Sequence, residues 1–72
     1  MNDRADRLEL VQAYIFDYQY DHDGAPAPIS RVEDAIVKTW GVSRSVAKHY
    51  ITQLGEEKRV RATGDGLVVV FR

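Results

Sequence analysis

Apolar residues recur along this 72-residue chain at two different periods. Up to about residue 57 they return every three or four positions, which is typical of helices with one buried side. Beyond residue 58, two short β-type runs flank a Gly-Asp-Gly segment, which is typical of a hairpin. The pattern therefore predicts helices over most of the chain and two strands near its C-terminal end.

The first helix is expected from about residue 4 to residue 20, with a buried stripe formed by Leu8, Val11, Ile15 and Tyr18. Between Tyr14 and Tyr20, aromatic residues also alternate as in a strand, and this alternative stays open. On a helix, Phe16 and Tyr20 lie one turn apart and away from the buried stripe. They either pack against the following loop or the hairpin, or they form a contact between two copies of the chain.

The second helix is expected over about residues 31–39. It follows a predicted loop that contains Gly24, Pro26 and Pro28. Ser30 and Glu33 have the spacing of a capping box, and Ile29 is placed for a hydrophobic staple. The prolines extend the backbone near Ile29, so this segment is also a candidate for a short additional strand.

The third helix is expected over about residues 44–57, with Ser43 as its N-cap. Its apolar side is formed by Val46, Ala47, Tyr50, Ile51 and Leu54. Its opposite side carries Arg44, Ser45, Lys48, His49 and Thr52, with no acid before Glu56. Such a surface on a helix buried on its other side suits insertion into a DNA major groove. A solvated amphipathic helix is the alternative.

The hairpin is expected over about residues 59–72, around the turn Gly64-Asp65-Gly66. Alternation predicts that Val60 and Ala62 face the core and that Arg59, Arg61 and Thr63 face outward. An isolated hairpin is only marginally stable, so this one is expected to lie against the helices.

Composition narrows the classes of function. The chain has no cysteine and only two histidines, and no cluster of metal ligands with suitable spacing, so no metal site is expected. No serine has a base and an orienting acid beside it, and no glycine loop leads into a helix, so an enzyme is not expected. The sequence indicates no cofactor and no small-molecule effector.

Charge and hydropathy bear on partners and location. The net charge is −1, but most acids precede residue 38 and most bases follow it. This split predicts an acidic face and a basic face, and the basic face suits phosphate groups. No apolar run approaches the length of a bilayer, so no membrane span is expected and a cytoplasmic protein is the default expectation.

The order helix, short strand, helix, turn, helix, hairpin is that of a winged helix-turn-helix domain, an α+β fold. From Gly24 to Leu54 the chain resembles the DNA-binding domain of LexA-type repressors. The matching pieces are Pro28-Ile29-Ser30 before the second helix and Gly41-Val42-Ser43 before the third. There are two departures: Lys58 stands where family members usually have glycine, and the hairpin turn carries Asp65.

The resemblance implies that residues 44–54 form the recognition helix, with its polar face in the major groove, and that residues 63–66 form the wing. The residues expected to contact DNA there are Arg44, Ser45, Lys48, His49 and Thr52. Asp65 repels phosphate, so wing-side backbone contacts are expected from Lys58, Arg59 and Arg61.

The expected function is sequence-specific binding of double-stranded DNA by a small transcriptional regulator. Two copies are expected on a palindrome, since one small domain offers few base contacts, and Phe16 and Tyr20 are the expected dimer contact. The alternatives are a protein-interaction winged helix and a DNA-binding accessory factor in recombination or replication.

Overall fold

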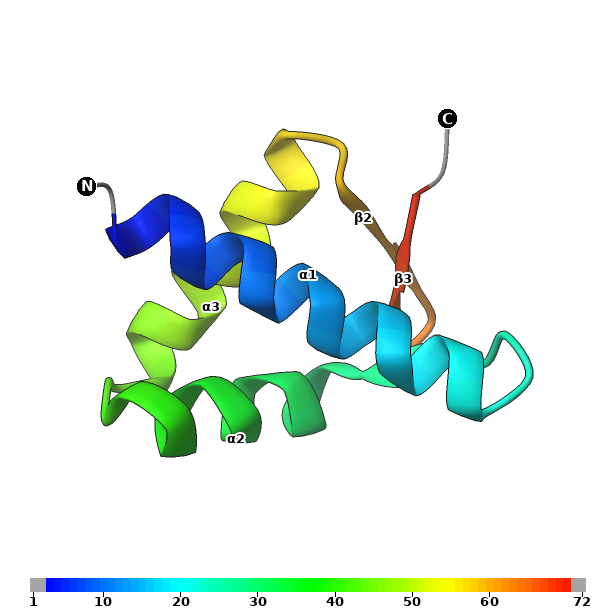
Figure 1. Ribbon diagram of the computed structural model, residues 1–72, viewed down its shortest axis with the longest axis horizontal. Coiled ribbons are helices and arrows are strands. Elements are labelled where there is room, and N and C mark those ends of the chain that lie inside the picture. The colour runs from blue at the N-terminus through cyan, green and yellow to red at the C-terminus, as the bar shows by residue number, and fades with distance from the viewer. Residues whose placement is uncertain (1–2, 71–72) are drawn as a thin grey trace.

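Helices and short strands follow one another in a computed structural model that describes residues 3–70 (Figure 1). The elements are α1 (Asp3–Asp21), β1 (Ala27–Pro28), α2 (Ile29–Trp40), α3 (Arg44–Glu56), β2 (Val60–Thr63) and β3 (Gly66–Val69). The expected α+β fold, with three helices and a C-terminal hairpin, is confirmed for the described residues. The arrangement is consistent with a winged helix. Residues 71 and 72 of the expected hairpin lie outside the described residues.

Helix α1 continues through the aromatic residues, so the strand alternative for Tyr14 to Tyr20 is wrong. Leu8, Val11 and Ile15 are buried along one side of α1, as the three- and four-residue spacing predicted, whereas Tyr18, the fourth residue of the expected stripe, is only half-buried against the same core. Only a helix places these residues on one side, and their burial outweighs the local β preference of the aromatic residues.

The sheet is antiparallel and has the order β1-β3-β2, so β3 lies in its middle. Ala27 of β1 pairs with Leu67, and Thr63 of β2 pairs with Gly66. The short additional strand is therefore present, at Ala27–Pro28, and Ile29 already belongs to α2. Gly66 permits this pairing, because a Cβ atom there would lie 2.5 Å from the Cβ of Pro26.

The hairpin departs from the expected alternation at several positions. Val60 is buried as predicted, but Ala62 is exposed although it pairs with buried Leu67 on the same side of the sheet. Leu67 lies in the middle strand, flanked by Ala62 and by the fully buried Ala27 of β1, whereas Ala62 has a described strand on one side only. Arg61 is exposed as predicted, whereas Thr63 is half-buried and its hydroxyl oxygen is enclosed.

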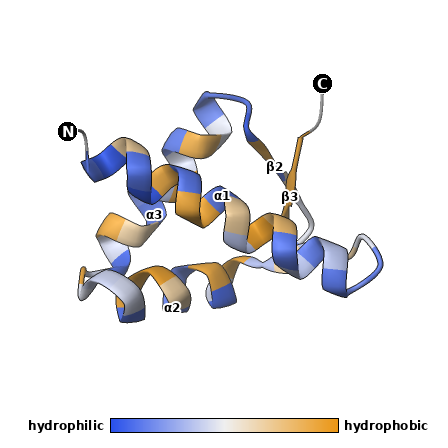
Figure 2. Ribbon diagram, in the orientation of Figure 1, coloured by the Kyte–Doolittle hydropathy of each residue, from blue (hydrophilic) through white to orange (hydrophobic). Residues whose placement is uncertain are grey.

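Every helix and strand contributes to one core. Its most deeply buried large side chains are Ile15, Val32, Ile36 and Leu54. In Figure 2 the hydrophobic stretches of α2 lie on the side turned toward α1, and β3 is hydrophobic along its length. The core therefore holds the sheet and α2 against α1, and α3 packs its apolar side on the same cluster.

The two helices of the expected helix-turn-helix begin differently. Ser43 caps α3 as predicted, and its Oγ accepts a hydrogen bond from the Val46 amide at 3.2 Å. The capping box expected at Ser30 is wrong, because α2 begins at Ile29 without a side-chain cap. The Ile29 amide instead donates to the Asp65 carbonyl at 2.9 Å, in the turn between β2 and β3. Strand pairing thus sets the start of α2.

Candidate nucleic-acid interface

Helix α3 presents one side to the core and the other to solvent. Ala47, Tyr50 and Leu54 are buried. The five residues predicted to face the major groove are all exposed on α3: Arg44, Ser45, Lys48, His49 and Thr52. The structure therefore brings the predicted recognition residues together on the outer side of one helix.

Arg44 has partners that the sequence did not predict. Its guanidinium forms ion pairs with Glu33, at 2.8 Å, and with Asp34, both in α2. The hydrogen bond to Asp34, followed by that to Glu33, raises the pKa of Arg44. Glu33 is buried, so its carboxylate holds the Arg44 guanidinium in one direction. Half of the Arg44 side chain remains exposed.

Aromatic and cationic side chains hold α3 against α1 and α2. Trp40 packs edge-to-face on Tyr50, with ring centroids 6.2 Å apart. Arg7 donates to the Tyr50 hydroxyl at 3.1 Å and lies 5.4 Å from the centroid of the Trp40 ring. Trp40 is therefore a packing residue at the edge of the core.

The C-terminal half of α3 joins a chain of hydrogen bonds that ends in α1. Arg4 Nε donates to Gln53 Oε1 at 2.6 Å, and Gln53 Nε2 donates to Glu57 Oε2 at 3.0 Å. The hydrogen bond from Gln53, followed by one from Arg59, lowers the pKa of Glu57. Glu56 and Glu57 also line a shallow hollow beside Thr52. The basic surface of α3 therefore ends at its last turn.

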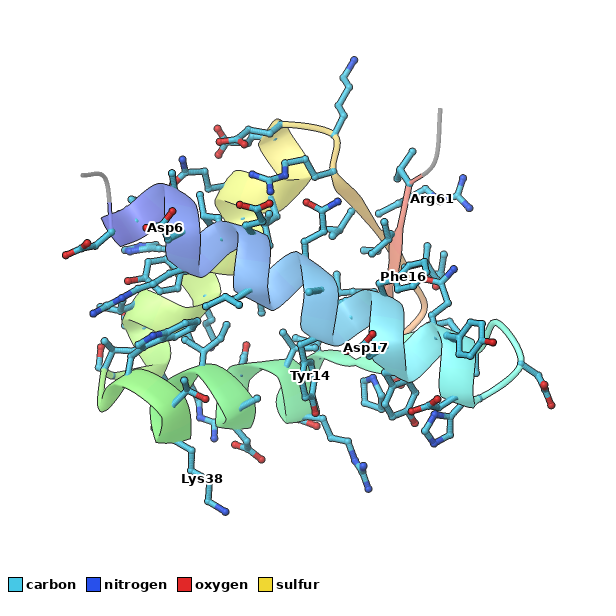
Figure 3. The ribbon with its side chains drawn as sticks, in the orientation of Figure 1. Asp6, Tyr14, Phe16, Asp17, Lys38 and Arg61 are labelled. Atoms are coloured by element: carbon cyan, nitrogen blue, oxygen red, sulfur yellow. The ribbon has the colours of Figure 1, made fainter. Side chains whose placement is uncertain are left out.

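The three basic residues predicted on the wing side differ in exposure. Lys58 is exposed and has a positive φ of 59°, and it follows Glu57, the C-cap of α3. Arg61 is exposed on β2 and extends away from the helices in Figure 3. The prediction that Arg59 faces outward is wrong: its Nε donates to Gln12 of α1 at 2.6 Å, and its Nη1 donates to Glu57 at 3.2 Å. The amide and the carboxylate draw this guanidinium toward the helices.

Phe16 and Tyr20 stack on each other, with ring centroids 6.4 Å apart. Their exposed fractions are 39% and 78%. In Figure 3, Phe16 lies on the side of α1 turned toward β3. Their assignment as a dimer contact stays a prediction.

The loop residue His22 has a local role. Its ring stacks on Tyr18, with centroids 3.9 Å apart, and its Nδ1 lies 2.8 Å from the Tyr18 carbonyl. Across residues 3–70 no group of three or more potential metal ligands is found. In the same part of the chain, no helix has the length and apolar character needed to cross a membrane.

Comparisons of the chain with models of known protein families, with curated proteins and with solved structures find no significant match. The functional argument therefore rests on the residues and their geometry.

Proposed function

We propose that this chain binds double-stranded DNA sequence-specifically through α3 and acts as a small transcriptional regulator. The observation that carries the proposal is the exposed side of α3. It combines cations, hydroxyls and an imidazole on a helix whose other side is buried in the core. A helix held in this way enters the major groove with its polar side chains directed at base edges and phosphates.

Lys48 is the central cation of this surface. It is exposed, and Ser45 and Thr52 lie three residues before it and four residues after it, on the same side of the helix. A lysine in the groove contacts guanine acceptors or phosphate, and the hydroxyls donate to base or backbone oxygens. Lys58 and Arg61 supply backbone contacts from the wing side, while Glu56 and Glu57 limit the contact to the first three turns of α3.

Arg44 contributes in a different way, because two carboxylates already bind its guanidinium. DNA phosphate competes with exposed Asp34 for this group, whereas buried Glu33 stays in place and orients it. We therefore expect a smaller loss of affinity from Arg44→Ala than from Lys48→Ala. For Asp34→Ala we expect tighter DNA binding, since that change removes a negative charge beside the groove.

The experiment begins with selection of duplexes from a random pool at two salt concentrations. Fluorescence anisotropy titrations with an enriched duplex then follow. Lys48→Ala is expected to weaken binding by about 1–3 kcal/mol if Lys48 reads a base. Lys48→Arg is the matched control, because it keeps the charge and restores the phosphate contribution. Equal affinity of Lys48→Ala and the unmodified chain would contradict the proposal.

Two alternatives are separated by the same experiment. Salt-sensitive retention without an enriched motif would indicate an accessory factor in recombination or replication. The protein-interaction alternative draws support from the exposed apolar side chains of Leu10 and Tyr20. It would be favoured if no duplex were retained at low salt.

A further inference from the structure

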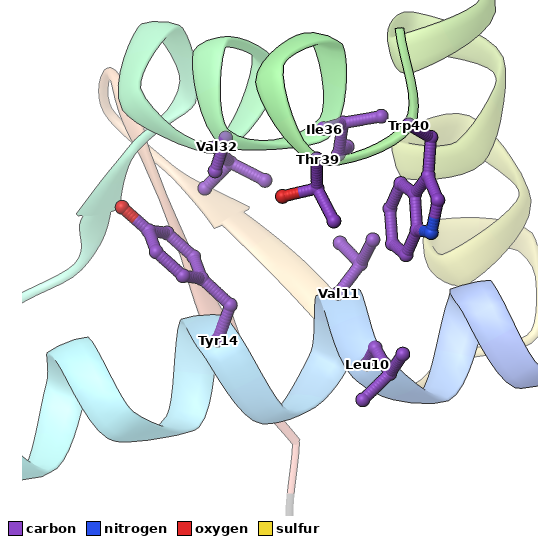
Figure 4. A pocket seen from close by; sticks show the side chains of 8 residues that line it. Leu10, Val11, Tyr14, Val32, Ile36, Thr39 and Trp40 are labelled. Atoms are coloured by element: carbon purple, nitrogen blue, oxygen red, sulfur yellow. The ribbon is translucent and has the colours of Figure 1, made fainter. Parts of the chain in front are cut away.

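An apolar groove runs between α1 and α2, on a part of the surface that DNA recognition does not use. Its lining includes Leu10, Val11 and Tyr14 of α1 and Val32, Ile36 and Trp40 of α2 (Figure 4). Leu10 is 59% exposed and Tyr14 is 37% exposed, so the groove leaves apolar surface in water. Its volume of about 190 Å³ is below that of ordinary ligand pockets, which favours a protein surface as its occupant.

The two helices run antiparallel along this groove. In Figure 4, Tyr14 lies opposite Val32, near the start of α2, whereas Val11 and Leu10 lie toward Trp40, at its end. One end of the groove is therefore formed by the later part of α1 and the start of α2. The other end is formed by the earlier part of α1 and the end of α2.

The unpaired charges beside the groove are mainly acidic on α1 and basic on α2, since Arg7 of α1 lies over the Trp40 ring and Asp34 of α2 is paired with Arg44. On α1, helical spacing places Asp6 and Asp17 on the same side as Leu10, and Asp3 and Asp21 extend this exposed row. On α2, exposed Arg31 and Lys38 flank Ala35 at the same spacing. The Arg31 guanidinium also lies 6.0 Å from the centroid of the Tyr18 ring of α1 and carries no ion pair among the described residues. Figure 3 shows Asp17 beside Tyr14 and Lys38 projecting from α2. Among the described residues, Asp6, Asp17 and Lys38 form no ion pair within the chain.

We propose that this groove docks a second copy of the chain, related to the first by a two-fold axis that runs along the groove. Such an axis exchanges the two borders and keeps the two ends, so the acidic border of one copy faces the basic border of the other. Because α1 and α2 are antiparallel, Asp17 of each copy meets Arg31 of its partner, and Asp6 meets Lys38. A two-fold axis across the groove would place acid against acid.

Between these charge pairs, Leu10 and Tyr14 of each copy lie against the α2 side of the partner's groove, which removes their apolar surface from water. This interface does not depend on DNA binding and forms without DNA. It also differs from the contact predicted at Phe16 and Tyr20, since Phe16 lies on the side of α1 turned toward β3.

Sedimentation equilibrium of the complete chain without DNA, from about 1 µM to about 1 mM, tests the proposal. We expect a reversible monomer–dimer equilibrium that weakens as salt is added. Asp17→Arg and Arg31→Asp are each expected to raise the dissociation constant about tenfold, because each replaces attraction by repulsion at two symmetric places. The double exchange D17R/R31D is expected to restore the constant to within about threefold.

Leu10→Ser is expected to raise the dissociation constant about tenfold without disturbing the core, since Leu10 is 59% exposed. Glu9→Arg is the matched control, because it makes the same kind of charge change elsewhere on the exposed surface of α1. Thermal melts establish that each variant is folded.

Three results would overturn the proposal. The unmodified chain could remain monomeric at 1 mM, or the double exchange could fail to restore a dimer that both single exchanges weaken. A dimer lost in Tyr20→Ser but kept in Leu10→Ser and Asp17→Arg would move the interface to the aromatic pair.

Discussion

Helices α2 and α3 pack against each other, yet they begin and end in different ways. Helix α2 begins without a side-chain cap, and its first amide, that of Ile29, donates a hydrogen bond to the Asp65 carbonyl. It ends at Gly41, which has a φ of 64°. Helix α3 begins with its own cap, Ser43, and ends before Lys58, which has a φ of 59°. The start of α2 therefore depends on a residue far away in the sequence, whereas its end is a glycine that adopts a positive φ without strain. The start of α3 depends on the adjacent Ser43, whereas its end requires a positive φ at a lysine, which is strained.

This difference shows which parts of the candidate interface depend on one another. The start of α2 depends on β1, β3 and the hairpin turn. A substitution in the hairpin turn can therefore shift α2, which carries Glu33 and Asp34. The start of α3 needs only the residues beside it. We therefore expect changes in the wing to alter how Arg44 is held while leaving the first turn of α3 intact.

The largest expected effect comes from Gly66→Ala, which tests whether the start of α2 depends on the pairing of β1 with β3. The added Cβ would lie 2.5 Å from Pro26 Cβ and 3.0 Å from the Ala27 carbonyl oxygen, so β1 must move away from β3. We expect a loss of about 1–3 kcal/mol in the free energy of unfolding, measured by urea denaturation, and faster hydrogen exchange at the Ile29 amide.

Gly55→Ala is the matched control for this substitution, because nothing lies within 4 Å of a Cβ atom built at Gly55 within α3. It is expected to stabilise the chain by about 0.5–1 kcal/mol. An equal response of the two glycines would show that the contact between Gly66 and Pro26 does not limit the sheet.

The next effect compares the two serines directly. Ser43→Ala removes the acceptor for the Val46 amide and is expected to cost about 1 kcal/mol in stability. Ser30→Ala is expected to change stability by less than about 0.5 kcal/mol, because Ser30 is exposed within α2 and caps nothing. Urea midpoints of the two variants check this, and a loss at Ser30 equal to that at Ser43 would contradict it.

A smaller effect of opposite sign is expected at the strained end of α3. Lys58→Gly relieves the left-handed backbone and is expected to stabilise the chain by about 0.5–1 kcal/mol. Lys58→Ala keeps the strain and serves as the control for the lost charge. If Lys58 contacts phosphate, both variants lose DNA affinity in anisotropy titrations, so stability and affinity would change in opposite directions in Lys58→Gly.

The smallest expected effect concerns Glu57. Hydrogen bonds from Gln53 and then Arg59 lower the pKa of Glu57, so the carboxylate stabilises the fold above the ordinary glutamate pKa. This contribution is lost as the pH falls through the lowered pKa of the folded chain. An NMR titration of the side-chain carboxyl is expected to show the shift, and in Gln53→Met the pKa of Glu57 should return toward its ordinary value. An unchanged titration in that variant would remove Gln53 as the principal cause.

The features that were predictable from the sequence are local ones. The period of apolar residues identified the buried side of α1, and Ser43 beside an apolar stripe identified the start of α3. The same reasoning failed at Ser30, where the capping-box spacing is present but strand pairing supplies a different partner. It also failed at Arg59, since alternation along a strand does not reveal a glutamine 47 positions earlier.

The sequence by itself determined the order of three helices and a C-terminal hairpin, the cap at Ser43, and the grouping of basic and hydroxyl side chains on α3. Each of these depends on residues within about one turn of one another, where backbone geometry dictates which side chains share a face. The sequence left a strand open between Tyr14 and Tyr20, which the packing of α1 decided. Only the tertiary structure decided that Glu33 and Asp34 bind Arg44, that Asp65 helps start α2, and that α1 and α2 leave an apolar groove between oppositely charged borders. Those features depend on how the helices cross and how the strands pair, and burial across the whole core sets that arrangement.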